Sequence, residues 1–156
     1  MANLTGTKGG SGVWQRIISE MPDHDVYIEA FWGRGTIAKK KRPANVTIGV
    51  DLDPDAISSG VDVAMMFECD SLKWLRSYFM LDSGVAAFGD AGPELHPDSR
   101  VSDATFGGAK LKRHLVYMDP PYLGFEHYYK FGVDHKDVID VFLALPCPAM
   151  ISGYHS

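Results

Sequence analysis

The sequence predicts an α/β protein in which a mostly parallel sheet carries helices on both faces. Short runs rich in β-branched residues alternate along the chain with stretches whose apolar residues recur at helical spacing. The chain has 156 residues, of which 46% are hydrophobic and 22% charged, which suits one domain with a real core and leaves no room for two. We therefore expect a single domain that spans residues 1–156.

The first half of the chain supplies three strands, each followed by a helix. Val13, Trp14 and Ile17 begin a run with helical spacing, and Pro54 fits the first turn of a later helix. Ser71 is expected to be the N-cap of the last helix in this half. In order, the predicted elements are a helix over 13–21, a strand over 26–30, a glycine turn into a helix, a strand over 46–50, a helix from 54 to about 60, a strand over 61–67 and a helix over 72–79.

The second half interrupts this alternation with a long polar segment. Residues 82–113 are rich in Gly, Pro, Asp and Ser, and such a stretch inside a compact domain is usually a functional loop or an insertion. Residues 114–118 then restore a strand. Asp134 can cap a following helix, and a last apolar run covers 149–151.

Composition and residue spacing bear on membrane association, disulfides and metal binding. No apolar run is long enough to span a bilayer and the N-terminus lacks a charged and then apolar leader, so we expect a cytoplasmic protein with no membrane partner. Cys69 and Cys147 have no Cys-x-x-Cys spacing and are expected to be free thiols. The histidines show no metal-ligand spacing, so we expect no metal site.

Charge argues mildly against a polyanionic partner. The net charge is −5, whereas DNA affinity depends largely on Lys and Arg that neutralise phosphates. Charge can be local, however, and basic residues gather at 39–42 and again at Lys110, Lys112 and Arg113. Each cluster is equally consistent with an ordinary solvated face.

A glycine loop follows the first predicted strand. In Phe31-Trp32-Gly33-Arg34-Gly35 the glycines would let the backbone approach a ligand closely, and Asp51 follows about 20 positions after that strand, where an acidic residue can bind a ribose diol. The pattern lacks the third glycine of the dinucleotide fingerprint. It indicates a nucleoside without identifying it, and a structural turn followed by a capping Asp explains it equally well. Asp70 is likewise either a ligand contact or a helix cap.

The segment Asp119-Pro120-Pro121-Tyr122 is far more specific, because a given four-residue match arises by chance in such a chain on the order of once in a thousand or less. Two prolines hold the backbone extended and remove two amide donors, so the Pro120 carbonyl and the Asp119 carboxylate can point outward together as acceptors. That pair fits an exocyclic amine of a nucleobase, and Tyr122 offers a face on which an extruded base can stack. The alternative is a rigid turn. All these motifs follow strands, so we expect them to share one cleft.

Five segments in this order resemble the motifs of the Dam-like DNA adenine N6-methyltransferases: Lys8-Gly9-Gly10, 29–35, 51–54, Cys69-Asp70 and 119–122. The resemblance implies a Rossmann-like fold that binds S-adenosylmethionine and methylates N6 of a flipped adenine in double-stranded DNA. It implies that the cofactor pocket is lined by Lys8, Gly10, Phe31, Gly33 and Gly35, with Asp51 at the ribose and Asp70 at the cofactor's adenine. It implies that the catalytic motif is Asp119, Pro120, Pro121 and Tyr122. Such enzymes often occur in bacteriophages and restriction-modification systems.

The chain departs from that family in three ways. Trp32 and Arg34 replace the small residues usual inside the glycine loop. Residues 82–113 occupy the slot of the target-recognition segment, but this insertion is short and partly acidic. Family members continue beyond 151–154 with further strands, so we expect the last strands to be missing and a partner chain or a missing C-terminal segment to complete the sheet.

Other functions stay open at this point. The same chemistry on N4 of cytosine or on adenine in RNA would use the same amine-binding motif. A truncated, catalytically inactive module that binds S-adenosylmethionine is the alternative from another class. A nicotinamide-dependent oxidoreductase is disfavoured by the absent third glycine.

Overall fold

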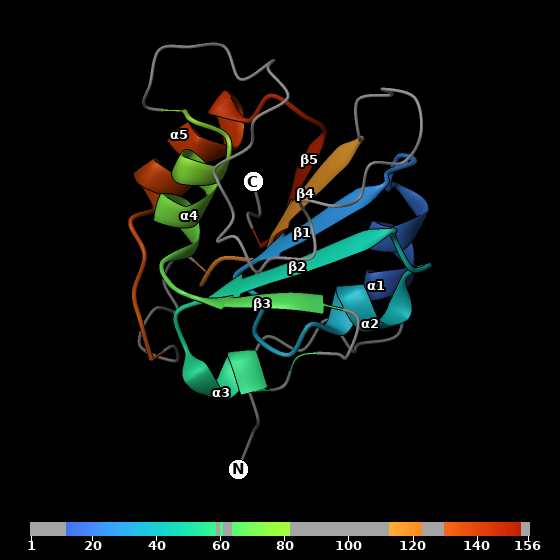
Figure 1. Cartoon of the computed structure of the whole chain (residues 1–156), viewed down its shortest axis with the longest axis horizontal. Helices are drawn as coiled ribbons and strands as arrows, with labels where there is room; N and C mark the ends of the chain where they lie inside the picture. Colours follow the sequence, from blue (N-terminus) through green and yellow to red (C-terminus); the bar gives the residue numbers. More distant parts are fainter. Residues whose placement is uncertain (1–11, 59, 61–63, 82–112, 123–129, 154–156) are drawn as a thin grey trace, which may run out of the picture.

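The computed structural model describes residues 12–58, 60, 64–81, 113–122 and 130–153, and the elements given below lie within these ranges. Figure 1 shows a layered arrangement, with a twisted sheet between helices.

Five strands form one sheet in the described part of the chain. They are β1 (Val26–Ala30), β2 (Val46–Asp51), β3 (Ala64–Glu68), β4 (His114–Met118) and β5 (Ala149–Ile151). The strand order is β3-β2-β1-β4-β5, and every neighbouring pair runs parallel. Strand β1 is therefore central, and all five of its residues are buried. A strand covered on both faces reads as a continuous apolar run, which β1 does apart from Glu29.

Helices cover both faces of the sheet (Figure 1). Helices α4 (Ser71–Tyr78) and α5 (His135–Ala144) pack on one face, and α1 (Val13–Ser19) and α2 (Thr36–Lys40) pack on the other, while α3 (Pro54–Ser58) follows β2. The alternation of side chains along β1 divides the core accordingly. Val26 and Ile28 belong to the cluster under α4 and α5, whereas Tyr27 belongs to the cluster under α1 and α2.

The predicted fold class is confirmed as α/β with a parallel sheet and helices on both faces, a pattern compatible with a Rossmann-like fold. One predicted cap was wrong. Asp70, and not Ser71, is the N-cap of α4, because Asp70 Oδ1 accepts hydrogen bonds from the amides of Leu72 and Lys73 at 2.9 and 3.0 Å. Asp134 caps α5 as predicted.

Three further expectations concern the insertion, membrane-spanning segments and the two cysteines. Residues 82–112 of the predicted insertion lie outside the described residues. Among the helices that the structure describes, none has both the length and the hydropathy to cross a membrane. Cys69 and Cys147 are free thiols.

Glu29 is a carboxyl group buried in the central strand, with 3% of its surface exposed. Its Oε2 accepts hydrogen bonds from the Tyr27 hydroxyl and from the Ala38 amide, each at 2.9 Å. Burial raises the pKa of Glu29 to about 8, against the opposing effect of these two bonds. The folded protein therefore keeps Glu29 largely protonated at neutral pH, whereas the unfolded chain ionises it.

A carboxyl whose pKa rises on folding makes the folded state lose stability as the pH rises. For Glu29 the loss begins near the ordinary pKa of 4.5 and is complete above a pH of about 8, with a slope of up to about 1.4 kcal/mol per pH unit. Glu29→Gln keeps an acceptor oxygen for Tyr27 and Ala38, so we predict that it removes this slope. Urea unfolding of both proteins at about pH 5, 6 and 7 measures the difference. Parallel pH profiles for the two proteins would contradict the assignment.

Candidate functional site

Three loops meet at the carboxyl edge of the sheet, where parallel strands place the residues that follow them. The loop after β1 contains Phe31 to Gly35, β2 ends at Asp51 with its loop following, and the segment after β4 begins at Asp119. Backbone hydrogen bonds connect these loops to neighbouring strands: Trp32 N–H donates to the Val50 carbonyl at 3.0 Å, and Asp119 N–H donates to the Ala30 carbonyl at 3.3 Å.

The loop after β1 turns sharply because it contains several residues in the left-handed region. Phe31, Gly33 and Gly35 have φ values of 60°, 53° and 59°. Glycine adopts such values without strain, whereas a bulky residue at positive φ is uncommon and is found mostly where surrounding contacts enforce it. Phe31 has such contacts, because its amide donates to Ser71 Oγ at 3.1 Å and its side chain packs against the core under α4 and α5.

Gly35 is required by the bulk of its neighbour Trp32. The Trp32 side chain is 2% exposed, and a Cβ placed on Gly35 would lie 2.2 Å from its indole ring. Gly49 of β2 is under the same constraint, since a Cβ there would lie 2.5 Å from the ring. Trp32, the departure from small residues noted in the sequence, thus fills the space between the loop and β2. Gly33 differs from Gly35, because it is exposed and an added Cβ would meet only the Phe31 carbonyl oxygen, at 4.0 Å.

Asp51 connects the first two loops. Its Oδ2 accepts a hydrogen bond from the Gly33 amide at 2.8 Å, and its Oδ1 accepts one from the Asp53 amide at 2.9 Å. A carboxylate offers about four acceptor positions, so these two donors leave capacity for a diol. The structure therefore places Asp51 and Gly33, both predicted from sequence, in direct contact.

Ser71 joins the loop after β1 to β2, a role that sequence analysis missed. Its hydroxyl donates to the Val50 carbonyl at 3.1 Å and accepts the Phe31 amide at 3.1 Å. Ser71 is buried at the first residue of α4. A serine after a strand gives the same local signal whether it caps a helix or bonds to a distant loop, so the sequence could not separate the two.

The segment after β4 is held on both sides. Asp119 receives a hydrogen bond on Oδ1 from Ser152 Oγ at 2.7 Å, in addition to the bond from its own amide to Ala30 of β1. Pro120 and Pro121 are buried, and Tyr122 is partly buried. The Tyr122 ring lies against Gly153, where an added Cβ would be 2.3 Å from the ring. The segment is thus a fixed platform at the carboxyl edge.

An ion pair links the residues beyond this segment to the loop after β2. Lys130 Nζ lies 3.0 Å from Asp53 Oδ1 and 4.0 Å from Asp55 Oδ2. Hydrogen bonding to the Lys130 ammonium lowers the pKa of Asp53. Lys130 therefore lies beside the residues that follow Asp51 at the carboxyl edge. Of the other predicted site residues, Asp70 serves as the cap of α4, and Lys8 and Gly10 lie outside the described residues.

The described residues of the two basic clusters make contacts with other parts of the fold. Lys40 lies over the Trp14 ring and Lys41 over the Tyr27 ring, at 4.6 and 4.3 Å, and Lys39 donates to the Arg34 carbonyl. Arg113 pairs with Asp25 at 3.2 Å, just before β1. Lys110 and Lys112 lie outside the described residues.

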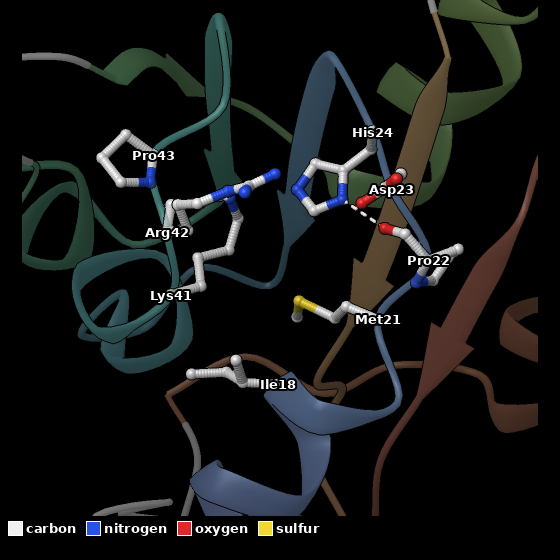
Figure 2. A pocket seen from close by; sticks show the side chains of 8 residues that line it. All are labelled: Ile18, Met21, Pro22, Asp23, His24, Lys41, Arg42 and Pro43. Atoms are coloured by element: carbon white, nitrogen blue, oxygen red, sulfur yellow. Dashed lines mark hydrogen bonds between the residues drawn. The ribbon is translucent and has the colours of Figure 1, made fainter.

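A hollow lies at the amino edge of the sheet, away from the candidate site. Figure 2 shows its lining, in which Lys41 and Arg42 approach from before β2 and His24 from before β1. The lining residues are Ile18, Met21, Pro22, Asp23, His24, Lys41, Arg42 and Pro43. His24 Nδ1 is bonded to the Pro22 carbonyl at 2.8 Å, and burial lowers the pKa of His24. The hollow is thus separate from Asp51, the last residue of β2, and from Asp119, which follows β4, since both lie at the carboxyl edge.

Comparison with known proteins adds no family: no family model matches the chain, and no curated protein matches it significantly.

Gly35→Ala should be strongly destabilising, because it adds a methyl group against the Trp32 ring at a positive φ. We expect a loss of about 3 kcal/mol or more in the free energy of unfolding, from clash and backbone strain together. Gly33→Ala is the matched control, since it shares the positive φ but meets open space, and should cost about 1 kcal/mol. Denaturant unfolding measures both, and equal losses would contradict the role given to Trp32.

Asp70→Ala should remove the N-cap of α4 and cost about 1 kcal/mol of stability. Asp70→Asn keeps an acceptor oxygen for the Leu72 and Lys73 amides, so it should retain stability within about 0.5 kcal/mol. Thermal unfolding of the two variants separates the cap from a general effect of lost charge, which would appear in both.

Proposed function

We propose that this protein is an S-adenosylmethionine-dependent methyltransferase that acts on N6 of an adenine extruded from double-stranded DNA. The observation that carries the proposal is the shared position of two groups at one sheet edge. The Asp51 carboxylate is on the last residue of β2, and the rigid Asp119-Pro120-Pro121-Tyr122 segment follows β4, on either side of β1. Nucleoside ligands of parallel α/β sheets bind at this edge.

The residues of the first two loops fit a nucleoside cofactor. Gly33 is exposed and has open space where a side chain would be, so its backbone can be approached closely. Asp51, held by the Gly33 and Asp53 amides, would bind the ribose hydroxyls through its remaining acceptor positions. In this proposal Phe31, Gly33, Gly35 and Asp70 border the pocket, together with Lys8 and Gly10. When bound, S-adenosylmethionine would supply an electrophilic methyl group.

The segment after β4 fits the amine of a base. The Asp119 carboxylate and the Pro120 carbonyl are acceptors, and both can bind the hydrogens of an exocyclic amine. Accepting these hydrogens favours a tetrahedral nitrogen whose lone pair is available for attack, and Asp119 can take up the proton that the nitrogen loses. Tyr122, supported by Gly153, offers a face for stacking the extruded base, at about 1–3 kcal/mol per base.

A second candidate is a binding module that holds S-adenosylmethionine without transferring methyl groups. The observation that favours it is the position of Lys40, Lys41 and Arg113, which contact Trp14, Tyr27 and Asp25, whereas Lys39 bonds to the Arg34 carbonyl of the loop after β1. A DNA substrate at the carboxyl edge would gain little from them. The N4 amine of cytosine and the N6 amine of adenine in RNA are alternative acceptors of the same chemistry, since the Asp119 carboxylate and the Pro120 carbonyl recognise an amine and not a whole base.

The sheet also has an edge at which another strand could pair. Strand β5 has three residues and one neighbour, β4, within the described part of the chain. We propose that a further segment or a partner chain pairs with it, because exposed strand edges are commonly covered.

The decisive experiment is transfer of labelled methyl from S-adenosylmethionine to unmethylated DNA, followed by digestion and separation of nucleosides. We expect label in N6-methyladenine. Label in N4-methylcytosine, or label with RNA alone, would change the substrate, and cofactor binding without label would select the binding module.

Two variants should separate cofactor binding from transfer. Asp119→Ala should abolish transfer and leave the Kd for S-adenosylmethionine within about threefold. Asp51→Ala should weaken cofactor binding by about 10- to 100-fold, as expected for lost hydrogen bonds to a charged group. Calorimetric titration gives both Kd values. Loss of cofactor binding in Asp119→Ala, with the fold intact by circular dichroism, would contradict the division of roles.

A further inference from the structure

Tyr117, Ser152 and Asp119 form a chain of hydrogen bonds beneath the carboxyl edge. The Tyr117 hydroxyl lies 3.0 Å from Ser152 Oγ, and Ser152 Oγ lies 2.7 Å from Asp119 Oδ1. A carboxylate can only accept hydrogen bonds, so Ser152 donates its single hydroxyl hydrogen to Asp119. Its oxygen must then accept the hydrogen of Tyr117. The direction of both bonds is therefore fixed by the chemistry of the three groups.

The strand register places these residues together. In the β4–β5 pair, Tyr117 is opposite Met150 and Met118 is opposite Ile151, and Ser152 N–H continues the ladder by donating to the Met118 carbonyl at 3.0 Å. Ser152 therefore follows β5 beside Asp119, which follows β4. The Asp119 amide is bonded to β1 on the other side. Strands β1 and β5 thus hold the backbone and the side chain of Asp119 respectively.

Tyr117 is the buried end of this series of hydrogen bonds. Tyr117 is 1% exposed, and burial raises the pKa of Tyr117 well above its ordinary value, so its hydroxyl stays protonated and remains a donor. A buried donor of this kind restricts the rotation of Ser152, because the Ser152 oxygen must face Tyr117 while its hydrogen faces Asp119. The orientation of the Asp119 carboxylate is in this way coupled to the core.

We propose that Ser152 is a positioning residue that sets the orientation of the Asp119 carboxylate, with Tyr117 fixing Ser152 in turn. The role rests on the proposed function, in which Asp119 binds the amine. In this account Ser152 acts through Asp119 and contacts neither the amine nor the methyl group. A simpler role for Ser152 would be to satisfy the buried Tyr117 hydroxyl, and the two roles make different predictions.

Kinetics of methyl transfer separate the two roles. Ser152→Ala should lower kcat by about 10- to 100-fold, the range expected when a reacting group loses its alignment, with KM for S-adenosylmethionine within about threefold. Ser152→Thr keeps the hydroxyl and should retain kcat within about fivefold. Ser19→Ala is the matched control, because it removes an exposed hydroxyl that donates to the Arg16 carbonyl of α1, far from Asp119 in the fold.

The double variant Tyr117→Phe with Ser152→Ala is the sharpest comparison. If Ser152 only satisfies Tyr117, removing both hydroxyls leaves no unpaired buried donor, and kcat should recover from the Ser152→Ala value. If Ser152 orients Asp119, kcat should stay low in the double variant. Recovery would overturn the proposal.

A second readout does not depend on activity. The Asp119 carboxyl carbon can be followed by NMR as the pH is lowered from about 7 in the full chain. Ser152→Ala removes a hydrogen bond to the charged form, so the pKa of Asp119 should rise by about one pH unit, and Ser152→Thr should leave it unchanged. Within the described residues, the titratable groups that interact electrostatically with Asp119 include Tyr27 and Glu29 of β1 and Tyr117 of β4, and Tyr122 in turn interacts with Tyr117.

The two readouts distinguish failure of the inference from failure of the proposed function. An Asp119 titration that is the same in wild type and in Ser152→Ala would overturn the positioning role, whatever the activity. A shifted titration in a wild-type protein that transfers no methyl group would support the contact between Ser152 and Asp119 and reject the proposed reaction.

Discussion

Two hydrogen bonds converge on the carbonyl oxygen of Val50, near the end of β2, and the arrangement of the carboxyl edge depends on them. The Trp32 amide and the Ser71 hydroxyl both donate to this oxygen, at 3.0 and 3.1 Å. The first bond sets the turn after β1, and the second fixes the start of α4. Because Ser71 also accepts the Phe31 amide, the loop cannot change its path without breaking contacts with both β2 and α4. This constraint keeps Gly33 in reach of Asp51 and accounts for the left-handed conformation of Phe31.

Much of the fold and part of the site followed from local sequence. The alternation of β-rich runs with helical periodicity predicts a parallel sheet, and the sheet has that form. The placement of Asp51 and Asp119 at the carboxyl ends of strands follows from the same pattern, since a motif's position relative to a strand is a local property. Asp134 as a cap was likewise visible in the sequence.

Other features could not be predicted because they are contacts between distant residues. Ser71 bonds to Phe31 across 40 positions, and Ser152 bonds to Asp119 across 33. A serine carries no local signal for such a partner. The need for glycine at position 35 arises from the Trp32 ring, and the direction in which that ring packs depends on Gly49 of β2. The protonated state of Glu29 also depends on burial that only the assembled sheet provides.

The distribution of charge bears on how a substrate would be held. Lys40 and Lys41 contact aromatic rings that pack in the core, and Arg113 pairs with Asp25. These three cations therefore make contacts within the fold. The cations near the carboxyl edge include Arg34 in the loop after β1 and Lys73 in the first turn of α4, both exposed. Contacts with DNA phosphates at this edge would depend on such exposed Lys and Arg side chains. The affinity that these contacts provide should fall as the salt concentration rises.

We propose that the carboxyl edge, and not the hollow at the amino edge, binds the methyl donor. Titration of the isotope-labelled protein with S-adenosylmethionine, followed through backbone amide NMR shifts, tests it most directly. We predict the largest changes at the amides of Gly33 and Asp53, which share the Asp51 carboxylate. Changes confined to His24 and Lys41 at the hollow, or no changes at saturating cofactor, would contradict the claim.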